Sequence, residues 1–466
     1  MSRSKRSEKN NKPNKSKVLL VVLSFFIIIV VAGALGVRHH IYSVCEKYDN
    51  VIYPGVSIEN IDVSGKTKEQ AITLINEKYG DKVLKKNILI KAPNKEYKIN
   101  YSQLNARYNI SETVNEAFGY TRNMGILQKY KLIKNSKNQR YTLKFKYDGK
   151  YIDVLLNEMK KEINSEAKDA TIRKVGDISF NVTESVNGKV LNEEKLKNDI
   201  NSSINGKVDD KDSIIKPEIK TVDAKVKSES LKSINSRISH FTTKFNTSAS
   251  NENRNYNIKL SAKAINGKLI MPGESFSFNE VVGERSAARG YKAAPVIVGN
   301  KVESGLGGGV CQVSSTLYNA VLRANIRSTQ RTPHTLPSSY VPKGLDATVS
   351  YGSLDYKFKN TLNYPVYLES YVQGNTLVCN VYSSSSLNQV KYDFVSEVYE
   401  TIPSSTNYVN DSTLPKGTEV VETTAKNGYK VNVYKITYKN GQQVSKDLLY
   451  KDYYKPRNGV VKRGTK

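Results

Sequence analysis

Residues 305–324 read GLGGGVCQVSSTLYNAVLRA, and this stretch decides the fold of the central part of the chain. Its apolar residues recur at the spacing of one helix face: Val313, Leu317, Val321 and Ala324. The pattern predicts a helix that starts near Gln312 and runs for about twelve residues, directly after a run of glycines. Cys311 therefore lies at the predicted N-terminus, where unpaired amides and the positive end of the helix dipole lower the pKa of a thiol.

The glycine run meets a second requirement of nucleophilic catalysis. Glycine permits positive φ and close approach of the backbone, so amides near the sulfur could point at a developing oxyanion. We expect the residues that hold this oxyanion or the substrate to be the neighbours of the cysteine: Gly308, Gly309, Val310 and Gln312.

A thiolate nucleophile also needs a proton carrier. Two of the four histidines adjoin a long apolar segment near the N-terminus, which leaves His240 and His334. His334 comes 23 residues after Cys311, beyond the predicted helix, and Pro333 favours an extended approach that can return the ring toward the helix start. We therefore expect Cys311 and His334 to form the catalytic dyad.

Other interpretations of Cys311 stay open at this point. A free cysteine is often buried as packing, and a disulfide with Cys379 would remove the thiol. With Cys45 the chain has three widely spaced cysteines, which do not make a disulfide framework. No metal or other cofactor is expected, because neither Cys-x-x-Cys nor His-x-x-x-His occurs. A serine enzyme is disfavoured, because Gly-x-Ser-x-Gly is absent and the Ser-x-x-Lys match at 165–168 lacks its partner motifs.

Composition indicates an ordinary globular chain of several domains. Hydrophobic residues make up 38% and charged residues 25%, which argues against disorder and against many membrane spans. At about 150 residues per domain, 466 residues predict about three folded units. The net charge of +28 is spread along the chain and is compatible with anionic lipid, wall polyanions or a solvated lysine-rich surface.

Residues 18–37 read VLLVVLSFFIIIVVAGALGV, twenty residues without a charge. At 1.5 Å per residue this run matches a hydrocarbon core of about 30 Å, so we expect a transmembrane helix. A cleaved signal peptide would have a shorter apolar run, although Ala32-Gly33-Ala34 faintly resembles a cleavage site. The basic residues of 1–17 predict that the N-terminus lies in the cytoplasm and that the chain after the transmembrane helix lies outside. We therefore expect the cytoplasmic membrane as a partner of the chain. Nucleic acid is not expected as a partner.

Two segments beyond the predicted linker 38–50 suggest repeated small modules. Thr67-Lys68-Glu69-Gln70 is a capping box that predicts a helix start after a short strand. A second, weaker pattern of the same layout predicts a strand at 178–182 and a helix after Asn192. The two patterns together suggest a duplicated module. The strand, turn and helix resemble peptidoglycan-binding modules found beside wall cross-linking enzymes.

The C-terminal residues predict an all-strand module. Alternating runs at 429–439 and 442–448 flank Asn440-Gly441, the strongest short signal for a hairpin. Residues 386–466 resemble the G-five domain of surface proteins, which implies binding to wall glycans. A structural β appendage stays open as an alternative.

The central region resembles the VanW domain through motif blocks that occur in order: Asn253-Arg254, residues 272–279, residues 282–285, Gly290-Tyr291, residues 307–312, Arg331, His334, residues 340–342, residues 344–347, Tyr351-Gly352 and Asp355. The resemblance implies a cysteine L,D-transpeptidase of peptidoglycan, with Cys311 as nucleophile and His334 as base. Its substrates would be stem peptides on glycan strands. A non-catalytic wall-binding protein and a hydrolase stay open as alternatives.

Arginines near the motif blocks could hold the acidic stem peptide, since guanidinium meets carboxylate bidentately. We expect this role for Arg285, Arg289 and Arg331, and either Asp346 or Asp355 could orient His334. The fold class expected is α+β and multidomain, with these parts: a basic tail 1–17, a transmembrane helix 18–37, a linker 38–50, mixed α/β modules 51–228, an α+β VanW domain 229–385 and an all-β G-five domain 386–466.

Overall fold

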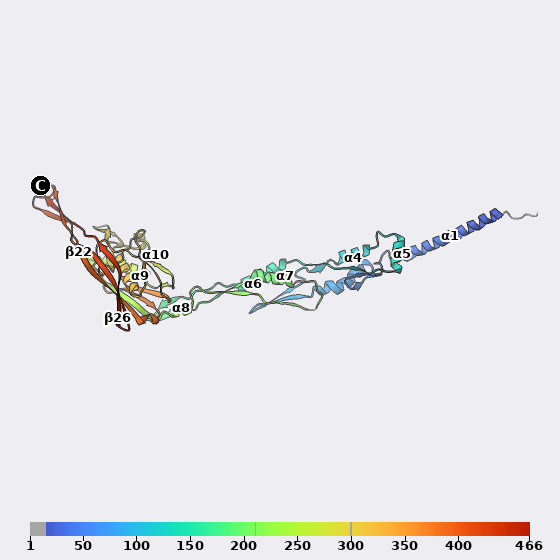
Figure 1. Ribbon diagram of the computed structural model, residues 1–466, viewed down its shortest axis with the longest axis horizontal. Helices are drawn as coiled ribbons and strands as arrows, with labels where there is room; N and C mark the ends of the chain where they lie inside the picture. The colour runs from blue at the N-terminus through green and yellow to red at the C-terminus, as the bar shows by residue number, and fades with distance from the viewer. Residues whose placement is uncertain (1–14, 210, 299–300) are drawn as a thin grey trace, which may run out of the picture. The chain divides into compact units, whose positions relative to one another are not determined.

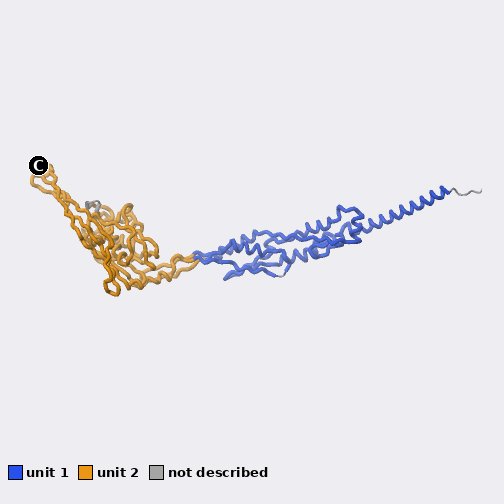
Figure 2. Tube along the Cα trace, viewed as in Figure 1, with its two compact units in different colours: residues 1–166, 189–222 blue, residues 167–188, 223–466 orange. Residues whose placement is uncertain are grey.

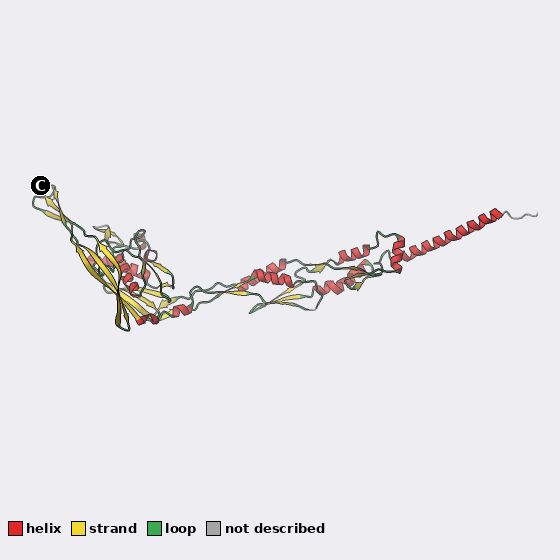
Figure 3. Ribbon diagram, in the orientation of Figure 1, coloured by secondary structure: helices red, strands yellow, loops and turns green. Residues whose placement is uncertain are grey.

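The computed structural model describes residues 15–209, 211–298 and 301–466 (Figure 1). The chain forms two compact units, one made of residues 1–166 and 189–222 and the other of residues 167–188 and 223–466 (Figure 2). Both units mix helices with strands, and strands dominate the C-terminal part (Figure 3). The expected α+β class is therefore confirmed.

Helix α1 (Lys15–Glu46) contains the long apolar segment, whose side chains are exposed, and its mean hydropathy over an 18-residue window is 3.2. Among the described residues it is the one helix long and apolar enough to cross a membrane. The helix continues through most of the segment expected to be a linker, because no glycine or proline follows Gly36 before its end. Cys45 near that end is buried, with its Sγ 3.8 Å from the carbonyl oxygen of Ile126 in α5 (Ile126–Lys134).

The first unit has two hydrophobic clusters. One lies under α2 (Lys68–Ile75) and α4 (Ile110–Gly119), beside a sheet of order β2 (Ile61–Asp62), β1 (Val56–Ile58), β6 (Gln139–Tyr141). The capping box at Thr67 is confirmed: its hydroxyl accepts from the Gln70 amide at 3.3 Å, and the Gln70 side chain accepts from the Thr67 amide at 3.1 Å. Side-chain capping thus fixes where α2 begins.

The second cluster lies between a sheet and a helix pair. The sheet has the order β11 (Ser213–Ile215), β3 (Asn87–Lys91), β4 (Glu96–Asn100), and the helices are α6 (Lys150–Ile163) and α7 (Glu193–Ser203). The remaining elements of this unit are short: η1 (Asn76–Gly80), α3 (Asp81–Val83), β5 (Arg107–Tyr108), β7 (Phe145–Lys146), β10 (Gly188–Leu191) and β12 (Ile219–Val222).

The strand expected at 178–182 and the helix expected after Asn192 both form, but they belong to different units. Asn192 caps α7 as predicted, because its side chain accepts from the Lys195 amide at 3.2 Å. However, the preceding strand β9 (Phe180–Val182) pairs with β8 (Ile172–Lys174) in the other unit. The chain changes unit after residue 188, between this strand and α7, so the strand and the helix do not share a core.

The second unit is built on a four-stranded antiparallel sheet. Its order is β13 (Ser236–Lys244), β21 (Thr376–Ser383), β20 (Val366–Gln373), β14 (Lys268–Ile270), and helices α9 (Glu252–Ile265) and α11 (Val310–Arg323) pack against it. The other elements here are α8 (Ser228–Lys232), η2 (Ala249–Asn251), β15 (Ser275–Ser277), α10 (Phe278–Val282), η3 (Ala287–Arg289), β16 (Ala293–Val298), β17 (Lys301–Leu306), β18 (Ser328–Gln330), β19 (Lys357–Lys359) and η4 (Ser385–Gln389).

The C-terminal strands form two sheets. The long sheet is β22 (Val390–Ile402), β25 (Gly428–Lys439), β26 (Gln442–Tyr454), and the small one is β23 (Thr406–Asp411), β27 (Gly459–Gly464), β24 (Glu419–Thr423). The hairpin at Asn440-Gly441 is confirmed, with positive φ at both residues (51° and 80°) as a type I′ turn requires. Residues of the long sheet, among them Val433 and Tyr454, belong to the same hydrophobic core as α11, so this sheet is continuous with the central region.

Candidate active site

The glycine run brings the backbone into close contact with its surroundings just before α11. Gly309 caps the helix at φ 102°, and a Cβ on it would lie 2.9 Å from Arg254 Cγ. A Cβ on Gly308 would lie 2.6 Å from the carbonyl oxygen of Pro295. Side chains at these positions would therefore displace neighbours, which explains the glycines. The helix begins at Val310, two residues before the predicted start, so Cys311 is its second residue.

Cys311 is partly buried and carries a free thiol, whose Sγ lies 3.4 Å from the carbonyl oxygen of Val349. Cys379 is also free and is fully buried on β21, with its Sγ 3.4 Å from Ser370 Oγ. The disulfide between these two cysteines that the sequence left open is therefore not formed.

His334 lies beside this thiol. Its buried imidazole hydrogen-bonds the Cys311 thiol, and its Nδ1 lies 2.5 Å from Asp346 Oδ2. The same carboxylate oxygen accepts the backbone amide of His334 at 2.7 Å. Of the two aspartates proposed to orient the histidine, Asp346 does so; Asp355 instead accepts from the Ser277 hydroxyl at 2.6 Å and from nearby backbone amides.

The electrostatics favour an ion pair between sulfur and imidazole. Burial raises the pKa of the Cys311 thiol, but the hydrogen bond and charge of His334, together with the charge of Arg285, lower it below its ordinary value. Burial alone would lower the pKa of His334, yet its bonds to Asp346 and Cys311 raise this pKa to about 9. Burial opposes ionisation of Asp346, and the imidazole and Arg331 outweigh it, so the pKa of this carboxyl is lowered.

Arg285 has a buried donor without a partner in the described part of the chain, and its charge lowers the pKa of the Cys311 thiol. Its Nη1 donates to the carbonyl of Gly283 at 3.1 Å, and its guanidinium stacks on Phe278 with 5.5 Å between the charge and the ring centroid. Its Nη2 is buried and has no hydrogen-bond partner among the residues the structure describes. A buried donor without a partner is costly, which points to a ligand that completes it.

Arg289 and Arg331 lie in other environments. Arg289 is exposed, and its Nη2 donates to the carbonyl of Val282 at 3.1 Å. Arg331 has only 8% of its side chain exposed and bonds to Asp346 and Asp452, with an Nη1 to Oδ2 distance of 2.7 Å for the second. The position of Arg331 therefore does not support the expected contact with substrate; this residue anchors the carboxylate that holds His334.

The Gln312 side chain is bonded to neighbouring elements of the fold and does not offer free donors to a substrate. Its buried amide donates to Thr243 Oγ1 at 2.9 Å and to the carbonyl of Lys244 at 3.0 Å, and it accepts from Arg254 at 2.9 Å. Its backbone N–H donates to Gly309, at 3.0 Å.

The backbone amides around the sulfur differ in whether they are used. The N–H of Val310 donates to the carbonyl of Gly307 at 3.1 Å. Within the described residues, the amides of Gly308, Gly309 and Cys311 have no intramolecular acceptor. These three amides are the donors left for an oxyanion.

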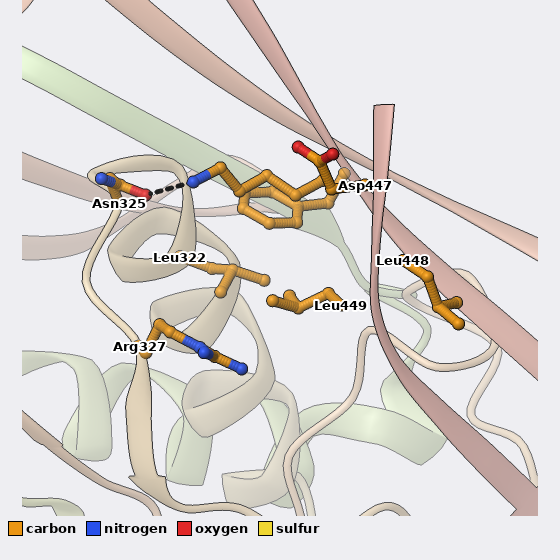
Figure 4. A pocket seen from close by; sticks show the side chains of 8 residues that line it. Leu322, Asn325, Arg327, Asp447, Leu448 and Leu449 are labelled. Atoms are coloured by element: carbon orange, nitrogen blue, oxygen red, sulfur yellow. Dashed lines mark hydrogen bonds between the residues drawn. The ribbon is translucent and has the colours of Figure 1, made fainter. Parts of the chain in front are cut away.

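Two cavities lie between α11 and the long sheet, and neither is lined by Cys311. The smaller, of about 170 Å³, contains the bond from Lys435 Nζ to Asn325 Oδ1 at 2.9 Å (Figure 4). The larger, of about 340 Å³, is lined by Arg331 and Asp452 themselves, and also by Pro333 and Tyr450. Neither Cys311 nor His334 lines either of these two cavities.

Comparisons with known proteins divide the chain into three domains. Residues 253–382 match the family "VanW like protein", residues 97–213 match "Putative peptidoglycan binding domain", and residues 395–466 match "G5 domain". The chain therefore carries a VanW-like domain, a peptidoglycan-binding domain and a G5 domain, as the sequence resemblances predicted. These are domains of a cell-wall-associated protein.

Curated relatives resemble part of the chain. "Uncharacterized protein YoaR" of Bacillus subtilis is 47% identical over 165 residues, which is 35% of this chain and 54% of the relative. "Vancomycin B-type resistance protein VanW" of Enterococcus faecalis is 39% identical over 114 residues, 23% of this chain and 42% of the relative. The chain thus spans about half the length of the curated relatives it matches. The solved "IgA1 Protease G5 domain structure" is 25% identical, covering 17% of this chain and 95% of that one, with a TM-score of 0.13.

The support for Asp346 is the part of the site that the sequence analysis missed. Tyr454 donates to Asp346 Oδ1 at 2.6 Å across a separation of 108 residues. No local pattern signals such a contact, because Tyr454 lies beyond the alternating run predicted at 442–448 and is 108 residues from Asp346.

Proposed function

We propose that the chain is a cysteine L,D-transpeptidase of peptidoglycan. The observation that carries the proposal is the hydrogen-bonded series Cys311, His334 and Asp346 at the N-terminus of α11. This series supplies an ionised nucleophile, a proton carrier and a group that orients the carrier. A cysteine used only as packing would need neither partner.

The first half-reaction forms a thioester. The third residue of a stem peptide is joined to its terminal D-Ala by an amide bond. The Cys311 thiolate attacks the carbonyl carbon of that amide. The tetrahedral oxygen accepts from the unused amides of Gly308, Gly309 and Cys311. The carbon–nitrogen bond then breaks, and the leaving nitrogen of D-Ala takes a proton from His334.

The second half-reaction joins two stems. The side-chain amine of the third residue of another stem attacks the thioester carbon and gives a proton to His334. The carbon–sulfur bond breaks and the thiolate returns. Water in place of the amine would give hydrolysis, with the same balance of protons.

Arg285 is suited to hold the donor peptide. Its unpartnered Nη2 is a buried cationic donor whose charge acts on the Cys311 thiol, and the terminal D-Ala carries a carboxylate. Replacement by lysine keeps the charge but loses the planar guanidinium that presents Nη2 while Nη1 is held by the carbonyl of Gly283. We expect R285K to raise KM for a stem tetrapeptide more than it lowers kcat.

The location follows from the N-terminal segment and the accessory domains. Helix α1 is long and apolar enough to anchor the chain in the cytoplasmic membrane, and the basic tail orients its N-terminus to the cytoplasm. The peptidoglycan-binding and G5 domains would then hold the remaining chain on stem peptides and glycan strands.

Intact mass after incubation with a stem tetrapeptide tests the proposal. The full chain in detergent should gain the mass of the acyl tripeptide and release D-Ala, and Cys311→Ala should do neither. Cys379→Ser is the matched control, because this fully buried thiol lies away from the histidine. Equal adducts in Cys311→Ala, or none in the wild type, would leave a non-catalytic wall-binding protein as the better account.

A further inference from the structure

One face of strand β26 meets the loop that carries Asp346. Tyr450, Asp452 and Tyr454 alternate along the strand and so point to the same side of the sheet. Tyr450 donates to the carbonyl of Gly344 at 2.7 Å, and Asp452 pairs with Arg331. The three side chains therefore contact Asp346 itself or the residues that hold it, Gly344 and Arg331. All three belong to the region matched by the G5 family.

The two oxygens of Asp346 have separate partners. Oδ2 faces the His334 ring and amide at 2.5 and 2.7 Å. Oδ1 accepts the Tyr454 hydroxyl at 2.6 Å and the Arg331 Nη2 at a longer 3.2 Å. Tyr454 thus makes the shorter of the two contacts that stop the carboxylate from rotating away from the imidazole.

Tyr454 also fixes the loop itself. Its hydroxyl accepts the backbone N–H of Gly344 at 2.6 Å, two residues before Asp346. The side chain is fully buried and Asp346 is 1% exposed, so water does not compete for these bonds. The charged groups that face the carboxylate are His334 and Arg331, with Asp452 behind the arginine.

We propose that Tyr454 is a positioning residue for the Cys311 and His334 pair, acting through Asp346, so that the G5 region completes the catalytic site. The inference rests on the proposed function. It means that this region contributes to the chemistry as well as to any binding of wall polymers.

Loss of the hydroxyl has a defined chemical consequence. In Tyr454→Phe, Oδ1 keeps only the 3.2 Å contact to Arg331, and Gly344 loses the acceptor of its amide. The carboxylate can then turn, and the imidazolium is stabilised less. The ion pair of thiolate and imidazolium therefore forms at a higher pH.

The pH dependence of alkylation tests this inference on the full chain in detergent. Iodoacetamide labelling of the Cys311 peptide, followed by mass spectrometry, gives the pH at which the thiolate appears. We expect Tyr454→Phe to raise this inflection by about half a unit to one unit. Tyr453→Phe controls for substitution on the strand, because its side chain is exposed on the opposite face and should leave the inflection unchanged.

Tyr450→Phe separates positioning from packing. It removes a hydroxyl from the same face that supports Gly344 without touching Asp346, so we expect a lower Tm with no shift of the inflection. An unchanged inflection in folded Tyr454→Phe, or equal shifts in both variants, would overturn the inference. An ordinary thiol inflection in the wild type would overturn the proposed function as well, so the two failures are distinguishable.

A second substitution keeps the test decisive if Tyr454→Phe does not fold. Incorporation of 3,5-difluorotyrosine at position 454 preserves size and hydroxyl and makes a stronger donor. The stronger bond withdraws charge from Asp346, so the proton resonance of His334 Nδ1 should move upfield. A resonance that does not move would contradict the inference.

Discussion

Replacement of Asp346 by asparagine removes the negative charge that holds the His334 imidazolium. Nδ1 of the ring lies 2.5 Å from Asp346 Oδ2. Only 1% of the aspartate is exposed, so water does not reach this bond. A hydrogen bond to a charged group contributes about 1.5–3 kcal/mol. At 2–3 kcal/mol, the thiolate and imidazolium pair would be about 30- to 160-fold less populated near neutral pH. The pKa of His334 should fall, since burial then acts without the carboxylate.

The assay is the rate of Cys311 alkylation at pH 7, with the thioester yield from a stem tetrapeptide measured in parallel. We expect both to fall by the factor above in Asp346→Asn. Asp355→Asn is the matched control, because this buried aspartate holds Ser277 and backbone amides away from the histidine. A wild-type alkylation rate in folded Asp346→Asn would refute the claim that the carboxylate sets the ionisation of the pair.

Three further outcomes are expected. Iodoacetamide at pH 7 should label Cys311 and spare Cys379, because burial raises the pKa of the latter to about 12, as peptide mapping would show. Acyl transfer should decline as pH rises through about 9, where His334 loses the proton that D-Ala requires, while alkylation persists; parallel pH profiles would contradict this. Gly309→Ala should lower stability by about 1–3 kcal/mol, measured by thermal unfolding, because φ is 102° and the new Cβ lies 2.9 Å from Arg254 Cγ; an unchanged Tm would contradict it.

Local patterns predicted the elements whose signals lie within a few residues. The capping box at Thr67 and the hairpin at Asn440-Gly441 each satisfy hydrogen bonds or φ requirements with adjacent residues, so the sequence specifies them directly. The pairing of Cys311 with His334 was also foreseeable, because glycines, a helix start and a returning loop constrain both. For the residue that orients His334, the sequence left two candidates, Asp346 and Asp355, and could not decide between them.

Long-range contacts explain what the sequence analysis did not predict. The support of Asp346 by Tyr454 joins residues 108 apart, and alternation along a strand says which face a residue takes but not what that face meets. Arg331 was expected at the substrate because guanidinium suits carboxylates, and the carboxylates it bonds are Asp346 and Asp452 of the chain itself. The strand at 178–182 and the helix after Asn192 lie in different units, and strand and helix patterns carry no information on which core they join.

The route of the chain between its two units bears on how the protein withstands proteases. The chain passes from one unit to the other three times, after residues 166, 188 and 222. Cleavage at any single crossing leaves each unit assembled from the same segments. In the first unit, the parallel pairing of β3 with β11 holds residues 189–222 in place. In the second unit, burial of Ala170 among Leu231 and Tyr367 holds residues 167–188 in place. Separation of the unit that carries Cys311 from the unit that carries α1 therefore requires more than one cleavage.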